Sequence, residues 1–253
     1  MNAQAAAGTA QATDILRSLE KDADLIQPRL RDWWVNYLGK HFDYYLDVLS
    51  SLDGVDRGAH ILEVGSVPGQ FTAMLKLLGF DVHGVDLDPS RVADFWQKYA
   101  LPIEKVDIEQ QALPFADGTF DVAIFAEVLE HLRINPLHAL SEIRRVLKPG
   151  GRIILSTPNI TPMDRVNFLL GRSYQGNPVK EFQKLEQIGH MGHIRLYSLD
   201  EIEGILKHVG FKVRGHTFKG KVMLRSFIDK VVGAVYPKKD QLRGFVFVSA
   251  TKE

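Results

Sequence analysis

The spacing of the apolar residues changes near residue 59 of this chain. Before that point apolar side chains recur at helical intervals, as Ile15, Leu19 and Ile26 do, and this predicts helices over residues 14–53. After it, short apolar runs alternate with amphipathic stretches, as expected for strands separated by helices. This order predicts an α/β fold with a mostly parallel sheet and helices on both faces.

Seven segments have the composition of strands. They read AHILEVG (59–65), DVHGVDLD (81–88), IEKVDIE (103–109), FDVAIFA (120–126), RIILSTPN (152–159), FKVRGHTF (211–218) and GFVFVSATK (244–252). The last two can pair antiparallel. Directly after the fourth segment the chain is expected to turn from strand to helix.

The chain divides into three parts on composition. Residues 1–13 are small and polar, which predicts a disordered tail. Residues 14–53 form an N-terminal helical cap, and residues 54–253 form the main domain. Residues 158–197, rich in Gly, Pro, Asn and His, interrupt the strand–helix order as an insertion. Ligands bind at the carboxyl ends of the strands in such sheets, and the insertion is expected to lie there.

Charge and composition exclude several classes of function. Lys plus Arg and Asp plus Glu both number 31, so net charge gives no argument for nucleic-acid binding. The absence of cysteine excludes disulfides, cysteine metal sites and a thiol nucleophile. No apolar run approaches the roughly 20 residues that span a bilayer, and the first residues lack the pattern of a signal peptide. A cytoplasmic location is the expectation.

A glycine-bracketed turn follows the first predicted strand. It reads Gly65-Ser-Val-Pro-Gly69, which matches neither the G-x-G-x-x-G dinucleotide motif nor a phosphate-binding loop. Asp86 closes the second strand, where an acid can accept hydrogen bonds from a ribose. Asp88, directly before Pro89, suits helix capping better, and this leaves Asp86 for the ribose.

Asp107 lies at the end of the third predicted strand. It could accept a hydrogen bond from an adenine amino group, with Ile108 against the face of the ring. An acid in a surface turn is the equally simple alternative for Asp107.

Taken together, five segments resemble the class I S-adenosylmethionine-dependent methyltransferases, particularly the group that includes ubiquinone-biosynthesis and glycan methyltransferases. They are ILEVGSVPGQF, VHGVDLDP, VDIE, LPFADGTFDVAIFAEVLEHL and LKPGGRIILSTPN, in that order over residues 59–157. The segment GHIRLYSLDEIEGILKHVGF also looks like the closing part of that group. The resemblance departs at Val67, where the family usually has a middle glycine.

The resemblance implies a Rossmann-like seven-stranded sheet with an antiparallel last strand, and S-adenosylmethionine as the cofactor. It implies that the residues binding this cofactor are Glu63, Gly65, Ser66, Gly69, Asp86, Leu87, Asp107, Ile108 and Glu127. Glu63, Gly65 and Gly69 would line the methionine end of the cofactor, Asp86 would take the ribose hydroxyls, and Asp107 with Ile108 would hold the adenine.

The segment EVLEH carries the candidate catalytic groups. If it is helical, Glu127, Glu130 and His131 share one face, and His190 and His193 follow downstream. The set resembles metal-dependent members of the superfamily, including small-RNA 2′-O-methyltransferases, and so implies a candidate Mg or Mn site. The same segment occurs in metal-free members, where His131 or His193, with Glu130 beside it, could act as a general base or could position other groups.

The acceptor is less constrained than the cofactor. The polar and basic composition of the insertion favours a saccharide or other polyhydroxylated acceptor, a small molecule or glycan, methylated on oxygen. A quinone, polyketide or lipid-like acceptor is the alternative, and a nucleic acid is disfavoured. The N-terminal aromatic residues could cap the acceptor pocket or simply dock a helix on the sheet.

Three further alternatives stay open. A non-catalytic, cofactor-binding regulatory subunit would share these motifs, and an NAD-dependent oxidoreductase is disfavoured by the spacing of the turn. The basic amphipathic stretch 219–243 could touch a membrane surface or simply pack on the domain.

Overall fold

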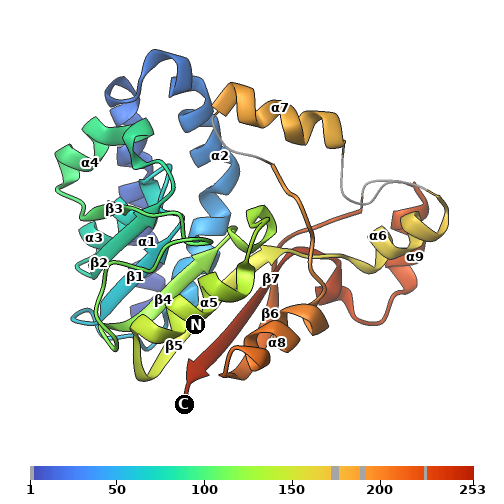
Figure 1. Ribbon diagram of the computed structural model, residues 1–253. Coiled ribbons are helices and arrows are strands. Elements are labelled where there is room, and N and C mark those ends of the chain that lie inside the picture. Colours follow the sequence, from blue (N-terminus) through green and yellow to red (C-terminus); the bar gives the residue numbers. More distant parts are fainter. Residues whose placement is uncertain (1–2, 172–176, 189–191, 225–226) are drawn as a thin grey trace.

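A seven-stranded sheet forms the middle of the molecule (Figure 1). Its strands are β1 (His60–Val64), β2 (Asp81–Asp86), β3 (Ile103–Lys105), β4 (Phe120–Ala126), β5 (Leu147–Pro158), β6 (Phe211–Val222) and β7 (Arg243–Lys252). They lie in the order β3-β2-β1-β4-β5-β7-β6, and β7 runs antiparallel to both of its neighbours while the other pairs are parallel. The predicted Rossmann-like sheet with an antiparallel last strand is confirmed.

The computed structural model describes residues 3–171, 177–188, 192–224 and 227–253. The helices within these ranges are α1 (Ala3–Leu19), η1 (Glu20–Leu25), α2 (Pro28–Ser50), α3 (Gln70–Leu77), η2 (Pro89–Val92), α4 (Ala93–Tyr99), η3 (Leu129–His131), α5 (Pro136–Val146), α6 (Pro162–Leu169), α7 (Pro178–Ile188), α8 (Leu199–His208), α9 (Phe227–Val235) and η4 (Lys239–Leu242). In these parts of the chain, no helix combines the length and the apolarity needed to cross a membrane.

Each face of the sheet has its own apolar core. Successive residues of a strand point to opposite faces, so Ile61 packs with the helices α1 to α4 while Leu62 packs with α5 and α8. In β4, Val122 and Ala123 divide between the two cores in the same way. The nearly continuous apolar strands are those of a sheet covered on both sides.

The N-terminal residues are helical where the sequence predicted disorder. Residues 3–13 continue into the helix α1, whose Ala12, Leu16 and Leu19 are fully buried. These three apolar side chains recur at helical spacing, and α1 packs on α2 and α3. The expected disordered tail over 1–13 is therefore wrong from residue 3 onward.

The helix α2 braces the glycine turn after β1. The indole N–H of buried Trp34 donates to the carbonyl oxygen of Pro68 at 2.9 Å, and the side chain of Gln70 donates to the carbonyl oxygen of Trp34 at 3.1 Å. The hydroxyl of Tyr45 donates to the amide oxygen of Gln70 at 3.3 Å. These buried bonds fix the N-terminal helices to the strand ends where the candidate site lies.

We expect Trp34→Phe to lower the free energy of unfolding by about 1–3 kcal/mol, because it leaves the buried Pro68 carbonyl without its donor and removes apolar volume. Urea unfolding followed by circular dichroism measures this. Val35→Ala, at a residue that is 40% exposed on the same helix, is the control and should change stability by less than about 0.5 kcal/mol. Equal stabilities of the two variants would contradict the bracing role.

Candidate functional site

The turn between β1 and α3 requires glycine at both ends. Gly65 and Gly69 have φ angles of 79° and 95°, in the left-handed region. A Cβ on Gly65 would lie 2.6 Å from the side chain of Val128, and one on Gly69 would lie 2.6 Å from Trp96. Between them, the Ser66 hydroxyl donates to the carbonyl oxygen of Glu63 at 3.0 Å. The turn therefore lies tightly against its neighbours, without a middle glycine.

Asp86, the last residue of β2, is held by the turn opposite it. One carboxylate oxygen accepts the Val67 N–H at 3.0 Å, and the other accepts the Asp88 N–H at 2.9 Å and lies 3.4 Å from the guanidinium of Arg91. Burial raises the pKa of Asp86, and these donors oppose that shift. A carboxylate oxygen can accept more than one hydrogen bond, so Asp86 keeps capacity for a hydroxyl donor.

A cavity of about 240 Å³ lies beside this turn. Of the predicted cofactor residues, it is lined by Gly65, Asp86, Leu87, Asp107, Ile108 and Glu127. Glu63, Ser66 and Gly69 are not among its lining residues: Glu63 and Ser66 are buried, and Gly69 packs against Trp96.

Other residues line this cavity that sequence reasoning did not place there. They include Trp33, Tyr37, Val67, Arg91 and His131. The two aromatic residues come from α2, a segment where an aromatic side chain is equally typical of core packing. Arg91 could have been suspected only from its position five residues after the strand-ending acid.

The strand β3 ends at Lys105, earlier than the predicted segment 103–109, so Asp107 lies in the loop that follows it. Its carboxylate accepts the N–H of Glu109 at 3.1 Å and the side-chain amide of Gln110 at 2.6 Å. These bonds shape the loop that places Ile108, 8% exposed, in the cavity wall. Asp107 is thus both a turn residue and a lining residue, and its contact with an adenine remains a proposal.

Glu63 is buried beneath the turn with one carboxylate oxygen unpaired. Its Oε2 has no hydrogen-bond partner among the described residues. Burial raises the pKa of Glu63 to about 8, against a smaller opposing effect of the Thr72 hydroxyl. The carboxyl is therefore mostly neutral at pH 7 when no cation is near it.

The segment after β4 is not the predicted helix. Glu127 has a φ of 57°, and its N–H donates to the Ser156 carbonyl oxygen of β5 at 2.9 Å instead of starting a helix. Only one 3-10 turn follows, over Leu129–His131. The expectation that Glu127, Glu130 and His131 share a helical face is therefore wrong.

Long-range contacts nevertheless bring the candidate catalytic groups together. Glu130, His131 and His193 offer one ligand atom each within 4.8 Å of one another. The backbone of Ile194 donates to the Glu130 carbonyl oxygen at 2.8 Å, and the N–H of His193 donates to the Glu181 carboxylate at 3.0 Å. These bonds hold His193 beside His131.

Two candidate metal ligands do not join this group. Glu127 is not part of the set within 4.8 Å. His190 lies outside the described residues.

The protonation of this cluster follows from its burial. Burial and mutual repulsion raise the pKa of Glu127, and burial raises that of Glu130, whose Oε2 accepts from the Thr157 hydroxyl at 2.9 Å. Burial lowers the pKa of His193 to about 4, so that ring is neutral at pH 7. The Nδ1 of His131 donates to the Gly192 carbonyl oxygen at 3.1 Å, which leaves the lone pair on Nε2.

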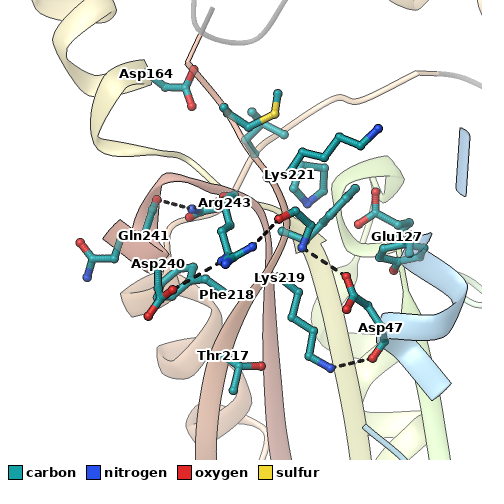
Figure 2. A pocket seen from close by; sticks show the side chains of 18 of the residues that line it. Asp47, Glu127, Asp164, Thr217, Phe218, Lys219, Lys221, Asp240, Gln241 and Arg243 are labelled. Carbon is teal, nitrogen blue, oxygen red and sulfur yellow. Dashed lines mark hydrogen bonds and ion pairs between the residues drawn. The ribbon is translucent and has the colours of Figure 1, made fainter. Parts of the chain in front are cut away.

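A second, larger cleft of about 1560 Å³ shares the lining residue Glu127 with the first cavity. Figure 2 shows the larger cleft. Glu127 lines both, His131 lines the smaller one, and His193 lines the larger one. Figure 2 shows Glu127 and Asp47 on one side of the cleft and Asp240 and Gln241 on the other. The cleft lies where the insertion 158–197 was expected to contribute, since Asn159, Asp164, Glu181 and His193 are in its lining.

Comparison with known proteins identifies the family. The model of the methyltransferase domain family matches residues 37–216. The chain belongs to this family. It is 31% identical over 159 residues to a Mycolicibacterium smegmatis protein named "probable S-adenosylmethionine-dependent methyltransferase", covering 62% of this chain and 53% of that one. The chain spans about half the length of the curated relatives it matches.

Two further comparisons agree. The ubiquinone biosynthesis O-methyltransferase of Nitrosococcus oceani is 32% identical over 122 residues, covering 46% of this chain and 51% of that one. An S-adenosylmethionine-dependent methyltransferase of known structure from Archaeoglobus fulgidus superposes with a TM-score of 0.58 at 17% identity, covering 83% of this chain and 93% of that one. The predicted class I methyltransferase domain, with S-adenosylmethionine as the cofactor of the family, is confirmed.

The residues present fit this cofactor. S-adenosylmethionine carries a sulfonium and an ammonium and no phosphate, and the buried oxygens Glu63 Oε2 and Glu127 Oε1 have no partner among the described residues. A buried carboxylate is stabilised by a nearby cation. The close approach allowed by Gly65 and the acid at Asp86 suit the rest of the nucleoside.

We expect the cofactor-free protein to lose stability as pH rises from 4.5 to 8. The unfolded chain releases the Glu63 proton near pH 4.5, whereas the folded chain keeps it until about pH 8, so the folded state binds more protons in between. Glu63→Gln removes the Glu63 contribution to this pH dependence, so the difference in unfolding free energy between the wild type and the variant should change by roughly 1 kcal/mol per pH unit. Urea unfolding at several pH values measures it.

Glu104→Gln, at an exposed residue of β3, is the matched control and should keep the wild-type pH dependence. A wild-type protein and a Glu63→Gln variant with parallel pH profiles would contradict the neutral, buried state of Glu63.

Proposed function

We propose that this chain transfers the methyl group of S-adenosylmethionine to a hydroxyl oxygen of a saccharide or another polyhydroxylated small molecule. One observation carries the proposal: the smaller cavity and the larger cleft meet at Glu127, with His131 on one side and His193 on the other. The smaller cavity would hold the cofactor and the cleft would hold the acceptor. The reacting groups would then meet beside the two imidazoles.

The bound cofactor supplies a methyl group on a sulfonium, which is already an activated electrophile. The chain's own residues have to hold the nucleoside, orient the acceptor and take up a proton. Asp86 would accept from the ribose hydroxyls, and Asp107 with Ile108 would contact the adenine. Glu127, in the wall shared by both cavities, would face the cationic end of the cofactor.

The walls of the cleft favour an acceptor with many hydroxyl groups. Its lining mixes carboxylates, amines and amides with the aromatic residues Tyr44, Phe218 and Phe245. Lys219 donates to the backbone carbonyl oxygen of Asp47 at 2.7 Å, and Arg243 forms an ion pair with Asp240 at 3.4 Å, so both basic side chains have partners in the protein (Figure 2). Paired polar groups between aromatic faces suit the alternating polar and apolar surfaces of a sugar ring.

His131 is the group best placed to take the hydroxyl proton. Its Nδ1–H is committed to the Gly192 carbonyl oxygen, so Nε2 is the basic nitrogen. The neutral ring of His193 lies 5.1 Å away between ring centroids. Glu130 would stabilise the imidazolium that forms, since its carboxylate is fully buried within the same cluster.

A quinone, polyketide or lipid-like acceptor is the second candidate. The relative in Nitrosococcus oceani named above is a ubiquinone biosynthesis O-methyltransferase, and the aromatic residues Phe218 and Phe245 could contact a flat ring. A metal-assisted reaction is a variant of either candidate, favoured by the ligand atoms of Glu130, His131 and His193 lying within 4.8 Å. A divalent ion there would bind the acceptor hydroxyl and lower its pKa.

An acceptor screen tests the proposal. The protein is incubated with S-adenosylmethionine and panels of saccharides, other polyols, quinones and lipid-like phenols, and mass spectrometry detects addition of one methyl group together with demethylated cofactor. We expect products in the polyol panels. Methylation of quinones alone would select the second candidate, and cofactor binding without turnover on any panel would favour a non-catalytic role.

With a productive acceptor, His131→Gln should lower kcat by roughly 100- to 10,000-fold while the affinity for the cofactor changes little. His138→Gln, at a half-buried residue of α5 that lines neither the cavity nor the cleft, is the control. Unchanged turnover in His131→Gln would remove His131 as the base.

The same assay in excess chelator, with Mg or Mn added back, separates the metal-free and metal-assisted forms. Mn binding followed by electron paramagnetic resonance gives a readout besides activity. Full turnover in chelator and no Mn signal would exclude the metal.

A further inference from the structure

We infer that the end of the molecule formed by α6, α9 and η4 binds the surface of an anionic phospholipid bilayer. We call these elements, together with the flanking residues Leu170 and Lys238, the α6–α9 lobe. Both helices lie together beyond the end of the sheet in Figure 1, and α6 packs against α9 and η4. The lobe also walls the acceptor cleft, because Asp164 and Lys238 are among the lining residues.

The lobe exposes large apolar side chains. The exposed fractions are 83% for Leu169, 80% for Val235, 63% for Phe168, 55% for Leu170 and 53% for Val231. Phe168, Leu169 and Leu170 are consecutive residues at the end of α6, and all three are exposed to solvent. Scattered single apolar residues are ordinary, whereas a group of them marks a contact surface.

This exposure is not the result of a loosely attached segment. The side-chain amide of Asn159 donates to the carbonyl oxygens of Gln241 and Arg243, both at 2.9 Å, where α6 and η4 leave the sheet. The hydroxyl of Tyr236 donates to Gln241 at 2.8 Å and ties the end of α9 to η4. The base of the lobe is thus fixed while its apolar residues stay exposed.

The charges around the apolar residues indicate which kind of partner binds the lobe. Arg165, Lys230 and Lys238 are exposed on the lobe, whereas the carboxylate of Asp164 is buried in a capping box. Asp240 is the exposed acid among the described side chains of α6, α9 and η4, and it pairs with Arg243 at 3.4 Å. The side chain of Asp229 lies outside the described ones.

Apolar side chains flanked by lysine and arginine are the pattern of a surface that enters the headgroup region of an anionic bilayer. Flexible basic side chains can reach the headgroups while the apolar ones insert. A bilayer therefore matches both the apolar and the basic part of the lobe. Because the lobe is a wall of the cleft, binding would also bring the cleft close to acceptors at the membrane surface.

Vesicle flotation tests the inference without reference to activity. The full chain is mixed with vesicles of phosphatidylcholine and phosphatidylglycerol, or of phosphatidylcholine alone. We expect partitioning to the anionic vesicles to be stronger by roughly tenfold or more, and to weaken with salt. Leu169→Asp should lower it by roughly tenfold. Arg165→Glu combined with Lys230→Glu should abolish the preference for anionic vesicles.

Matched controls lie on helices outside the lobe. Leu77→Asp replaces an apolar residue of α3 that is 45% exposed, and Arg17→Glu with Lys21→Glu reverses two exposed charges on α1 and η1. Both should bind as the wild type does, and circular dichroism checks that every variant is folded.

Three results would overturn the inference. The first is no enrichment on anionic vesicles, and the second is equal binding by Leu169→Asp and the wild type. The third is a lipid-free dimer that Leu169→Asp dissociates, which would show that a second copy of the chain covers the lobe.

Discussion

A group of buried carboxyl groups at the carboxyl ends of the central strands is the constraint on which the site depends. Glu63 comes from β1, Asp86 from β2, and Glu127 and Glu130 from the segment after β4. All four lie near the Tyr37 hydroxyl, since burial and the charges of these acids together raise its pKa. Carboxylates in a low-dielectric interior must bind protons, accept hydrogen bonds or face a cation. Asp86 receives backbone donors, whereas Glu63 and Glu127 each keep an unpaired oxygen among the described residues. The site is therefore arranged for a cationic ligand.

The architecture around these acids explains how they stay in place. The parallel strands deliver their last residues to one edge of the sheet, and the turn after β1 closes over Asp86 through the Val67 N–H. The helix α2 reinforces the same turn from the other side through Trp34. On the far side, the backbone of Glu130 holds the loop that carries His193. Local strand ends and distant loops thus meet at one place.

Sequence reasoning succeeded where function and local pattern coincide. The alternation of strands and helices, the two glycines that bracket the turn and the acid that ends β2 follow from spacing and residue type, whereas the antiparallel last strand was expected from the family resemblance. Gly65, Asp86 and Ile108 in the wall of the smaller cavity were therefore predictable. Two expectations failed because tertiary contacts decided them. Residues 3–13 continue into the helix α1, whose buried residues Ala12, Leu16 and Leu19 belong to a helix that packs on α2 and α3. Glu127 is not helical because the Ser156 carbonyl oxygen of β5 accepts its N–H.

Proton release on cofactor binding tests the central claim most directly. Calorimetry at pH 7 in buffers of different ionisation enthalpy counts the protons exchanged when S-adenosylmethionine or its demethylated product binds. Because cations would lower the raised pKa values of the buried carboxyls, the account predicts release of protons with S-adenosylmethionine and less release with the product, which lacks the sulfonium charge. Proton uptake, or equal exchange with both ligands, would contradict it.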